Sequence, residues 1–179
     1  MLGSALLVTA LATLGIVVGI LWSKRRASRL RGLVLPLELR NARLIFAERL
    51  FRSTGKAAIT ARVDRAYRVA SGAVVLLELK TRDRNRVYLS DVIELSAQRA
   101  AVALQTGEIV ADHAYVAVQR CDGSMLGVRR VRLMAISEVV ELAARREAIV
   151  LGRMTPSFAD SVQVCRRCAF ARDCEKVGR

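Results

Sequence analysis

The segment from Ala73 to Leu79 is almost wholly apolar, and it constrains the fold of this chain more than any other feature. Such a run is typical of a strand that is buried on both faces of a sheet. It ends in Glu78-Leu79-Lys80, so an acid and a lysine stand two positions apart. Because side chains alternate along a strand, Glu78 and Lys80 are expected to point to the same face.

A second acid, Asp64, lies in the preceding segment, Ala57 to Val69, which also has the pattern of a strand. Ser71-Gly72 forms the turn between the two segments. If the strands pair across this turn, Asp64 and Glu78 can converge. Two neighbouring carboxylates stay ionised most easily around a divalent cation, and oxygen ligands suit Mg²⁺ or Mn²⁺. The pattern therefore predicts a metal site in which Lys80 holds an attacking water or neutralises charge on a phosphate.

With these two strands included, the whole domain is expected to have the order helix, two strands, helix, two strands and helix. The expected helices are Pro36 to about Phe51, Ser90 to Gln105 and Ser137 to Val150, and the later strands are Ala111 to Gln119 and Gly127 to Met134. A domain of about 150 residues is large enough to bury a normal core.

Two polar side chains on the expected helices are candidates to complete the site. Gln98 shares one stripe of its helix with Asp91, Glu94 and Gln105. It could reach a DNA backbone or a metal-bound water, but such a stripe is also typical of the solvated face of an amphipathic helix. Glu48 lies beside the apolar stripe of the expected first helix, where a carboxylate is costly unless it is paired, for example with Arg52, or bound to a metal.

Residues Leu2 to Trp22 carry no charge and are rich in Leu, Val, Ala and Ile. About 20 such residues span the hydrocarbon core of a bilayer as a helix. Basic residues follow at Lys24, Arg25, Arg26, Arg29 and Arg31, and the positive-inside rule keeps this flank in the cytoplasm. A cleaved signal peptide is the alternative, but no positive segment precedes the run and no A-x-A-like site follows it. We therefore predict a single-pass membrane anchor over residues 1–23, a basic linker over 24–35 and a cytoplasmic domain.

The net charge of +14, from 30 Lys and Arg against 16 Asp and Glu, favours a polyanionic partner, either nucleic acid or an anionic lipid surface. Aromatic residues make up only 4% of the chain. We therefore expect contacts to phosphates, rather than base stacking, to supply most of the affinity, and this affinity should weaken with salt.

The order of the candidate residues along the chain resembles that of the PD-(D/E)xK nuclease superfamily. It consists of a helix with an acid, a strand with Asp, a strand with Glu-x-Lys and a helix with Gln. More narrowly, the chain resembles the RecB-like nucleases that include the CRISPR-associated exonucleases with a cysteine cluster. The resembling stretch runs from about Leu37 to Cys174, through GKAAITARVDRAYRV, VVLLELKTR, ELSAQRAAVAL and CRRCAFARDC. The resemblance implies an α/β fold with a restriction-endonuclease-like core, which is a mixed central sheet flanked by helices.

The same resemblance assigns metal binding to Asp64 and Glu78, a catalytic role to Lys80 and a further metal contact to the carbonyl of Leu79.

Two positions depart from the family pattern. The Gln-x3-Tyr motif of the family falls on Gln98 and Val102, so its tyrosine is missing here. Many members carry a histidine on the first helix, where this chain offers Glu48. The single histidine, His113, lies on a later strand, and we expect it to be structural.

Three cysteines, Cys165, Cys168 and Cys174, form a compact cluster. In the reducing cytoplasm such thiols indicate metal binding rather than disulfides. In the resembling exonucleases, three C-terminal cysteines of this spacing join one upstream cysteine around a 4Fe-4S cluster. The only other cysteine here is Cys121. Four thiolates hold an iron–sulfur cluster or Zn²⁺, and the resemblance favours iron–sulfur over zinc, with cysteines that bind nothing as the alternative.

The sequence therefore predicts a membrane-anchored, Mg²⁺- or Mn²⁺-dependent DNA nuclease. Its nuclease-like domain covers residues 36–152, and a cysteine-rich tail covers residues 153–179. The resemblance alone indicates single-stranded or end-bearing DNA as substrate. One alternative is a nucleic-acid-binding or scaffolding protein at the membrane that has the same fold without catalysis. The other is a basic membrane-surface protein with no role in nucleic-acid chemistry.

Overall fold

The computed structural model describes residues 35–54, 58–159, 161–166, 168, 169, 171 and 174. The predicted membrane anchor and nearly all of the basic linker lie outside these residues. In the part of the chain that the structure describes, no helix is long and apolar enough to cross a bilayer.

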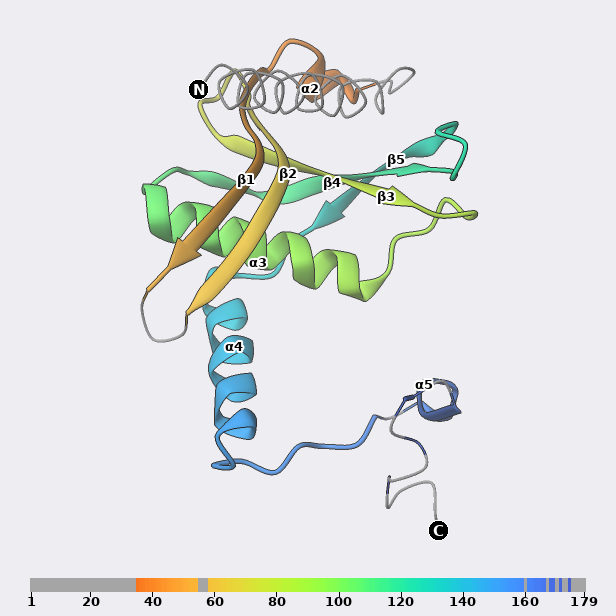
Figure 1. Ribbon diagram of the computed structural model, residues 1–179. Coiled ribbons are helices and arrows are strands. Elements are labelled where there is room, and N and C mark those ends of the chain that lie inside the picture. Colours follow the sequence, from red (N-terminus) through yellow and green to blue (C-terminus); the bar gives the residue numbers. More distant parts are fainter. Residues whose placement is uncertain are drawn as a thin grey trace, which may run out of the picture.

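Five strands form one mixed sheet in the order β1-β2-β3-β4-β5. The elements in chain order are α2 (Leu37–Arg40), β1 (Arg43–Ser53), β2 (Ile59–Arg68), β3 (Val74–Thr81), α3 (Leu89–Thr106), β4 (Val110–Gln119), β5 (Met125–Arg132), α4 (Ile136–Val150) and α5 (Val162–Arg166). Neighbouring strands are antiparallel except β3 and β4, which are parallel and joined by the crossover helix α3 (Figure 1). The chain thus has an α/β fold with a mixed sheet and helices. From β2 to α4, each predicted element has bounds within about two residues of those observed.

The helix predicted from Pro36 to Phe51 is wrong, because the structure has a short α2 followed by the long strand β1. The cause is a bulge in β1 between Leu44 and Phe46. Consecutive side chains of a regular strand point to opposite faces, but here Ile45 and Phe46 both pack against the same core cluster. The bulge therefore interrupts the regular alternation by which a strand is identified in a sequence, and Glu48 lies on a strand and not on a helix.

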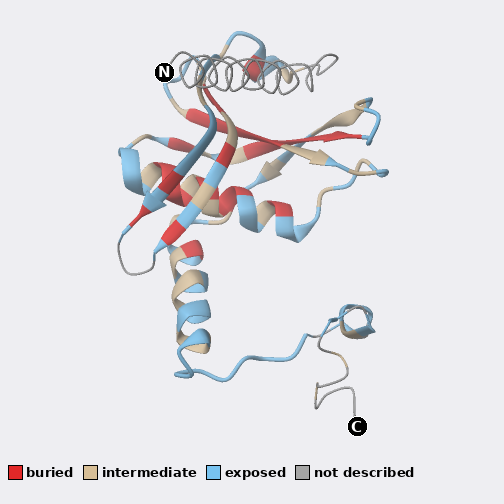
Figure 2. Ribbon diagram, in the orientation of Figure 1, coloured by how far each residue is buried: buried red, intermediate tan, exposed pale blue. Residues whose placement is uncertain are grey.

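The core lies on both faces of β3, as predicted for a strand that is covered on each side (Figure 2). Val74 and Leu76 pack in the larger core cluster, which includes Leu95 and Val102 of α3. On the opposite face, the smaller cluster contains Val75, Leu77, Leu39, Tyr67 and Tyr115. The side chains of β3 that follow Val74 and Leu76 on the α3 face are Glu78 and Lys80, so the fold turns both toward α3.

The strands β2 and β3 pair only over a short stretch, from Arg68 with Val74 to Arg65 with Leu77. Farther on, β2 continues with β1 as a two-stranded hairpin that packs on α3, while β3 continues beside β4 (Figure 1). The sheet therefore opens between β2 and β3, next to the end of β3 that carries the Glu-x-Lys motif.

Candidate active site

Asp64 stands at the point where β2 leaves β3, and the register places it opposite Glu78, immediately after the last pair. Its Oδ2 accepts a hydrogen bond from the backbone N–H of Leu79 at 3.0 Å. This carboxylate thus replaces the missing strand partner. The N–H and C=O of one strand residue point to the same side, so the carbonyl of Leu79 also faces the opening beside Asp64.

Glu78 is at the centre of the site and is only 5% exposed. Its Oε1 lies 2.8 Å from Nζ of Lys80, and its Oε2 accepts a hydrogen bond from Nε2 of Gln98 at 2.8 Å. Burial raises the pKa of Glu78 to about 7, and the nearby Asp64 carboxylate adds to this increase, while the hydrogen bonds from Gln98 and Lys80 oppose it. A divalent cation would stabilise a buried carboxylate in this setting.

Lys80 lies between two carboxylates, because its Nζ is also 2.6 Å from Oε2 of Glu94. Burial alone would lower the pKa of Lys80, but hydrogen bonds to Glu78 and Glu94 raise it above its ordinary value. Lys80 therefore stays a cation near neutral pH. It is suited to orienting a water or balancing negative charge, and not to acting as a base.

Three polar side chains of α3 pair with alternate residues at the end of β3 and just beyond it. The pairs are Gln98 with Glu78, Glu94 with Lys80, and Asp91 with Arg82. A fourth, Gln105, accepts a hydrogen bond from the backbone N–H of Arg52 at 2.6 Å. Asp91 and Gln98 are each 1% exposed, whereas Glu94 and Gln105 are exposed, so only part of this stripe faces solvent. Sequence reasoning missed Glu94 and Arg82 as site partners. The i, i+3, i+7 spacing on α3 matches the i, i+2, i+4 spacing along β3 and beyond it, but this match has a meaning only once the helix is known to lie across that strand.

Glu48 lies on β1, in register with Asp64, between the pairs Ala47 with Arg65 and Arg49 with Val63. It is exposed, and among the described non-glycine residues it alone has a positive φ, of 51°. A left-handed backbone at such a residue is strained and often marks a functional site. Glu48 is thus on the rim beside Asp64, on a different strand from the one that carries Glu78.

The described residues contain no group of three or more His, Cys, Asp or Glu side chains arranged to hold a metal ion. The site therefore offers two carboxylates, Asp64 and Glu78, with the carbonyl of Leu79 beside them. This set fits Mg²⁺, which keeps several waters and usually takes only one or two carboxylates from the protein. Each carboxylate also has lone pairs beyond those used by the hydrogen bonds described above.

Two other predicted positions lie away from the site. Val102, where the resembling family has a tyrosine, is fully buried in the core. His113 on β4 lies 3.0 Å from the carboxylate of Glu38, which also accepts a hydrogen bond from the hydroxyl of Tyr115 at 2.7 Å. These contacts join α2 to the sheet, in keeping with a structural role for His113.

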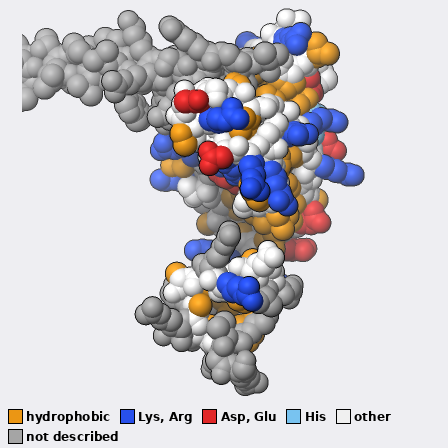
Figure 3. Space-filling view, turned by 90° about the vertical axis from the view of Figure 1, so that its right-hand side faces the viewer, with side chains coloured by type: hydrophobic (Ala, Val, Ile, Leu, Met, Phe, Trp, Pro, Cys, Tyr) orange, Lys and Arg blue, Asp and Glu red, His pale blue; other side chains and the backbone are white. Residues whose placement is uncertain are grey.

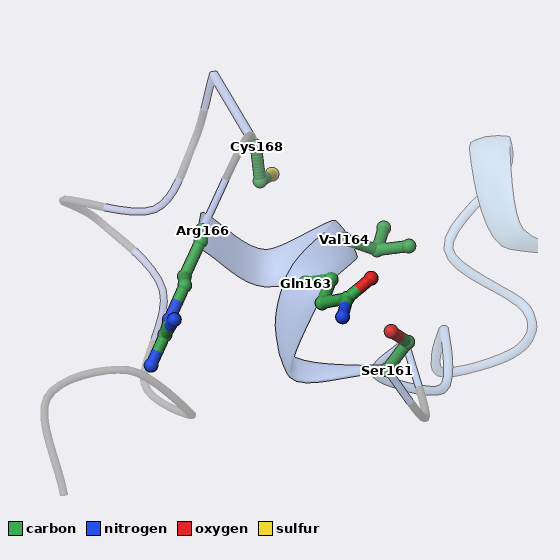
Figure 4. Close-up of a pocket in the computed structure, with 5 residues that line it drawn as sticks. All are labelled: Ser161, Gln163, Val164, Arg166 and Cys168. Atoms are coloured by element: carbon green, nitrogen blue, oxygen red, sulfur yellow. The ribbon is translucent and has the colours of Figure 1, made fainter.

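The tail cysteines line a common cavity, but Cys121 does not. Cys165, Cys168 and Cys174 surround a largely apolar space together with Pro156 and Phe158. Cys168 also lines an adjacent hollow beside Ser161, Gln163, Val164 and Arg166 (Figure 4). Cys121 is exposed in the turn between β4 and β5, well separated from α5 in Figure 1. Within the described ranges, the four-thiolate set that an iron–sulfur cluster requires is not assembled.

No family model and no curated protein matches the sequence. Among solved structures, the chain is similar to SSO0001, with 17% identity and a TM-score of 0.45, over 90% of this chain and 70% of that chain. It is also similar to a putative exonuclease from Eubacterium rectale, with 14% identity and a TM-score of 0.40, over 68% of this chain and 51% of that chain. The chain thus spans about half of the length of that second protein. Both similarities are remote.

Proposed function

We propose that this chain is a metal-dependent nuclease that hydrolyses phosphodiester bonds in DNA. The observation that carries the proposal is the meeting of Asp64, Glu78, Lys80 and Gln98 where β2 and β3 separate. A structural ion pair at a strand end would not need a second carboxylate beside it, nor a buried glutamine that holds the first.

Each side chain has a defined task in this proposal. Asp64 and Glu78, with the carbonyl of Leu79, would hold Mg²⁺ or Mn²⁺, and the bound ion would supply Lewis-acid chemistry that activates a water beside a phosphate. Gln98 fixes the orientation of the Glu78 carboxylate through its hydrogen bond. Lys80 supplies a positive charge next to the phosphate, where negative charge develops during hydrolysis. Glu48 is a further candidate ligand on the neighbouring strand.

The charge of the molecule supports a nucleic-acid substrate. The chain has an excess of 14 positive charges. Lys and Arg side chains gather on the end of the domain toward which β3 points (Figure 3). An electropositive surface beside a site of this kind raises the local concentration of a polyanion. The predicted anchor over residues 1–23 would hold this site at the cytoplasmic face of a membrane.

Cleavage of labelled DNA with Mg²⁺ or Mn²⁺ tests the proposal. Lys80→Ala and Glu78→Gln should each lower the rate by roughly 100- to 1,000-fold, the effect typical of removing a group that stabilises transition-state charge. Glu94→Gln removes only one of the two partners of Lys80. An exposed ion pair of this kind contributes about 0.2–1 kcal/mol, so the cleavage rate should fall by roughly fivefold at most. Arg146→Ala, an exposed change on α4, is the control.

Undiminished cleavage by Lys80→Ala or Glu78→Gln would overturn the assignment. Salt-sensitive DNA binding by the native chain without turnover in any divalent metal would instead favour the non-catalytic nucleic-acid-binding protein.

A further inference from the structure

The loop from Arg82 to Tyr88, which connects β3 to α3, is held firmly in place. The backbone N–H of Arg82 donates to the carbonyl of Gln119 at 2.8 Å, and the guanidinium of Arg82 pairs with Asp91. Nδ2 of Asn85 donates to the carbonyl of Leu126 at 3.1 Å, and the backbone N–H of Tyr88 donates to Oδ2 of Asp91 at 2.9 Å. The Arg82 guanidinium also donates to the carbonyl of Arg86 at 3.0 Å, which closes the loop on itself. The loop is therefore fixed to β4, to β5 and to α3.

Despite these anchors, the loop presents to solvent an aromatic ring and two arginines that have no carboxylate partner among the described residues. Arg84 and Arg86 are exposed, and none of the described carboxylates forms an ion pair with either. Tyr88 is 43% exposed, in a chain with few aromatic residues. The guanidinium groups of Arg82 and Arg86 lie over its ring, with their central carbons 4.7 and 5.4 Å from the ring centre, and these cation–π contacts help to hold the ring in place.

The loop also adjoins the candidate active site. Arg82 follows Lys80 by two positions, and its partner Asp91 lies one turn of α3 before Glu94, the partner of Lys80. Whatever occupies the opening beside Glu78 can therefore extend over the loop. The end of the domain shown in Figure 3 carries this loop and is rich in Lys and Arg.

We propose that the loop Arg82–Tyr88 is a docking platform for single-stranded DNA, in which Tyr88 stacks on a base while Arg84 and Arg86 contact phosphates. This inference rests on the proposed function and narrows its substrate. In a duplex, both faces of each base are covered by the neighbouring bases, whereas an unstacked base of a single strand can stack on an aromatic ring. A basic track combined with an exposed aromatic side chain is the usual design for binding single strands.

Fluorescence anisotropy of the full-length protein in detergent tests the stacking. The probes are a labelled single-stranded oligonucleotide and a duplex of the same sequence, with Ca²⁺ in place of Mg²⁺ so that binding is measured apart from cleavage. Tyr88→Ala should weaken single-strand binding by roughly 5- to 150-fold, which corresponds to about 1–3 kcal/mol for a stacked base. Tyr88→Phe keeps the ring and should bind like the native protein, and the duplex affinity should not change in either variant.

Salt titration separates the arginines from the tyrosine. Arg84→Ala and Arg86→Ala should each reduce the slope of log affinity against log salt by about 0.7, the value for one phosphate contact on a single strand. Tyr88→Ala should leave this slope unchanged, because stacking releases no counterions. Arg146→Ala on α4 removes the same charge from an exposed position outside the loop and should change neither the slope nor the preference for single strands.

Native-like single-strand binding by Tyr88→Ala, or equal slopes for Arg84→Ala, Arg86→Ala and Arg146→Ala, would overturn the inference. Cleavage of the same oligonucleotides by the native protein with Mg²⁺ distinguishes this failure from failure of the proposed function. If the native protein cuts DNA but Tyr88→Ala binds single strands normally, only the platform is disproved. If binding depends on Tyr88 but the native protein does not cut DNA, only the proposed hydrolysis is disproved.

Discussion

Glu78 should make the stability of the domain depend on pH in the opposite sense to an ordinary surface carboxylate. Its pKa rises from 4.5 to about 7 in the folded protein. Between these values the folded chain keeps a proton that the unfolded chain has lost, so stability falls as the pH rises through this range. Thermal unfolding of the metal-free protein should show this decrease in Tm, and Glu78→Gln should remove it.

Mg²⁺ should oppose this loss of stability, because it binds the ionised carboxylate and any ligand of the folded state alone raises Tm. The increase in Tm with Mg²⁺ should therefore be largest above pH 7 and should disappear in Glu78→Gln. An equal increase in the native protein and in this variant would place the metal elsewhere.

At the scale of elements, the pair formed by Arg82 and Asp91 connects the end of β3 to the first turn of α3. The Asp91 side chain is 2% exposed and that of Arg82 is 23% exposed. Among the described residues, Arg82→Ala would leave the buried Asp91 carboxylate with a hydrogen bond from the backbone N–H of Tyr88 alone. We expect a loss of about 3 kcal/mol in the free energy of unfolding, the low end of the range for breaking a buried pair, because Arg82 itself is partly exposed.

Urea unfolding measures this difference. Arg84→Ala, two positions along the same loop, removes an exposed and unpaired arginine and should change the free energy of unfolding by no more than about 0.5 kcal/mol. Equal stabilities of the two variants would show that Arg82 and Asp91 contribute no more than a surface pair.

The elements that could be predicted from sequence are those with uninterrupted periodicity. β3 is a continuous apolar run, and alternation along it correctly placed Glu78 and Lys80 on one face. β1 could not be predicted, because its bulge puts Ile45 and Phe46 against the same core cluster. The contact between Gln98 and Glu78 was also beyond the sequence, since periodicity defines the stripe of a helix but not the strand across which that stripe lies.

At the scale of the whole molecule, the two faces of the sheet have different tasks. The α3 face of β3 carries the candidate active site, while α2 packs on the opposite face through Leu39 and through the contacts of Glu38 with His113 and Tyr115. The predicted anchor and linker precede α2 in the sequence. If residues 1–23 insert in a membrane, the chain enters the domain on the face opposite the site, so the tether would leave the opening between β2 and β3 accessible to DNA.

The tail is the part of the molecule for which sequence and structure give different ligand sets. The resemblance predicts four cysteines around one cluster, whereas the structure places three around a common cavity and Cys121 in a separate turn. We therefore expect any metal held by the tail to survive Cys121→Ser and to be lost in Cys165→Ser or Cys168→Ser. If the three tail thiolates hold a metal, a water could serve as its fourth ligand, as at metal sites that keep an open position.

Iron and zinc analysis of protein purified without oxygen, together with its visible absorption spectrum, provides the measurement. Cys121→Ser and Cys165→Ser each remove one thiol, so the two variants control for each other. Equal loss of metal in both would mean that Cys121 is a ligand and that the tail folds onto the β4–β5 turn when metal is bound. If the native protein contains neither iron nor zinc, the tail cysteines do not bind a metal. They would then not stabilise the tail, because a set of thiolates does so only through the ion that it binds.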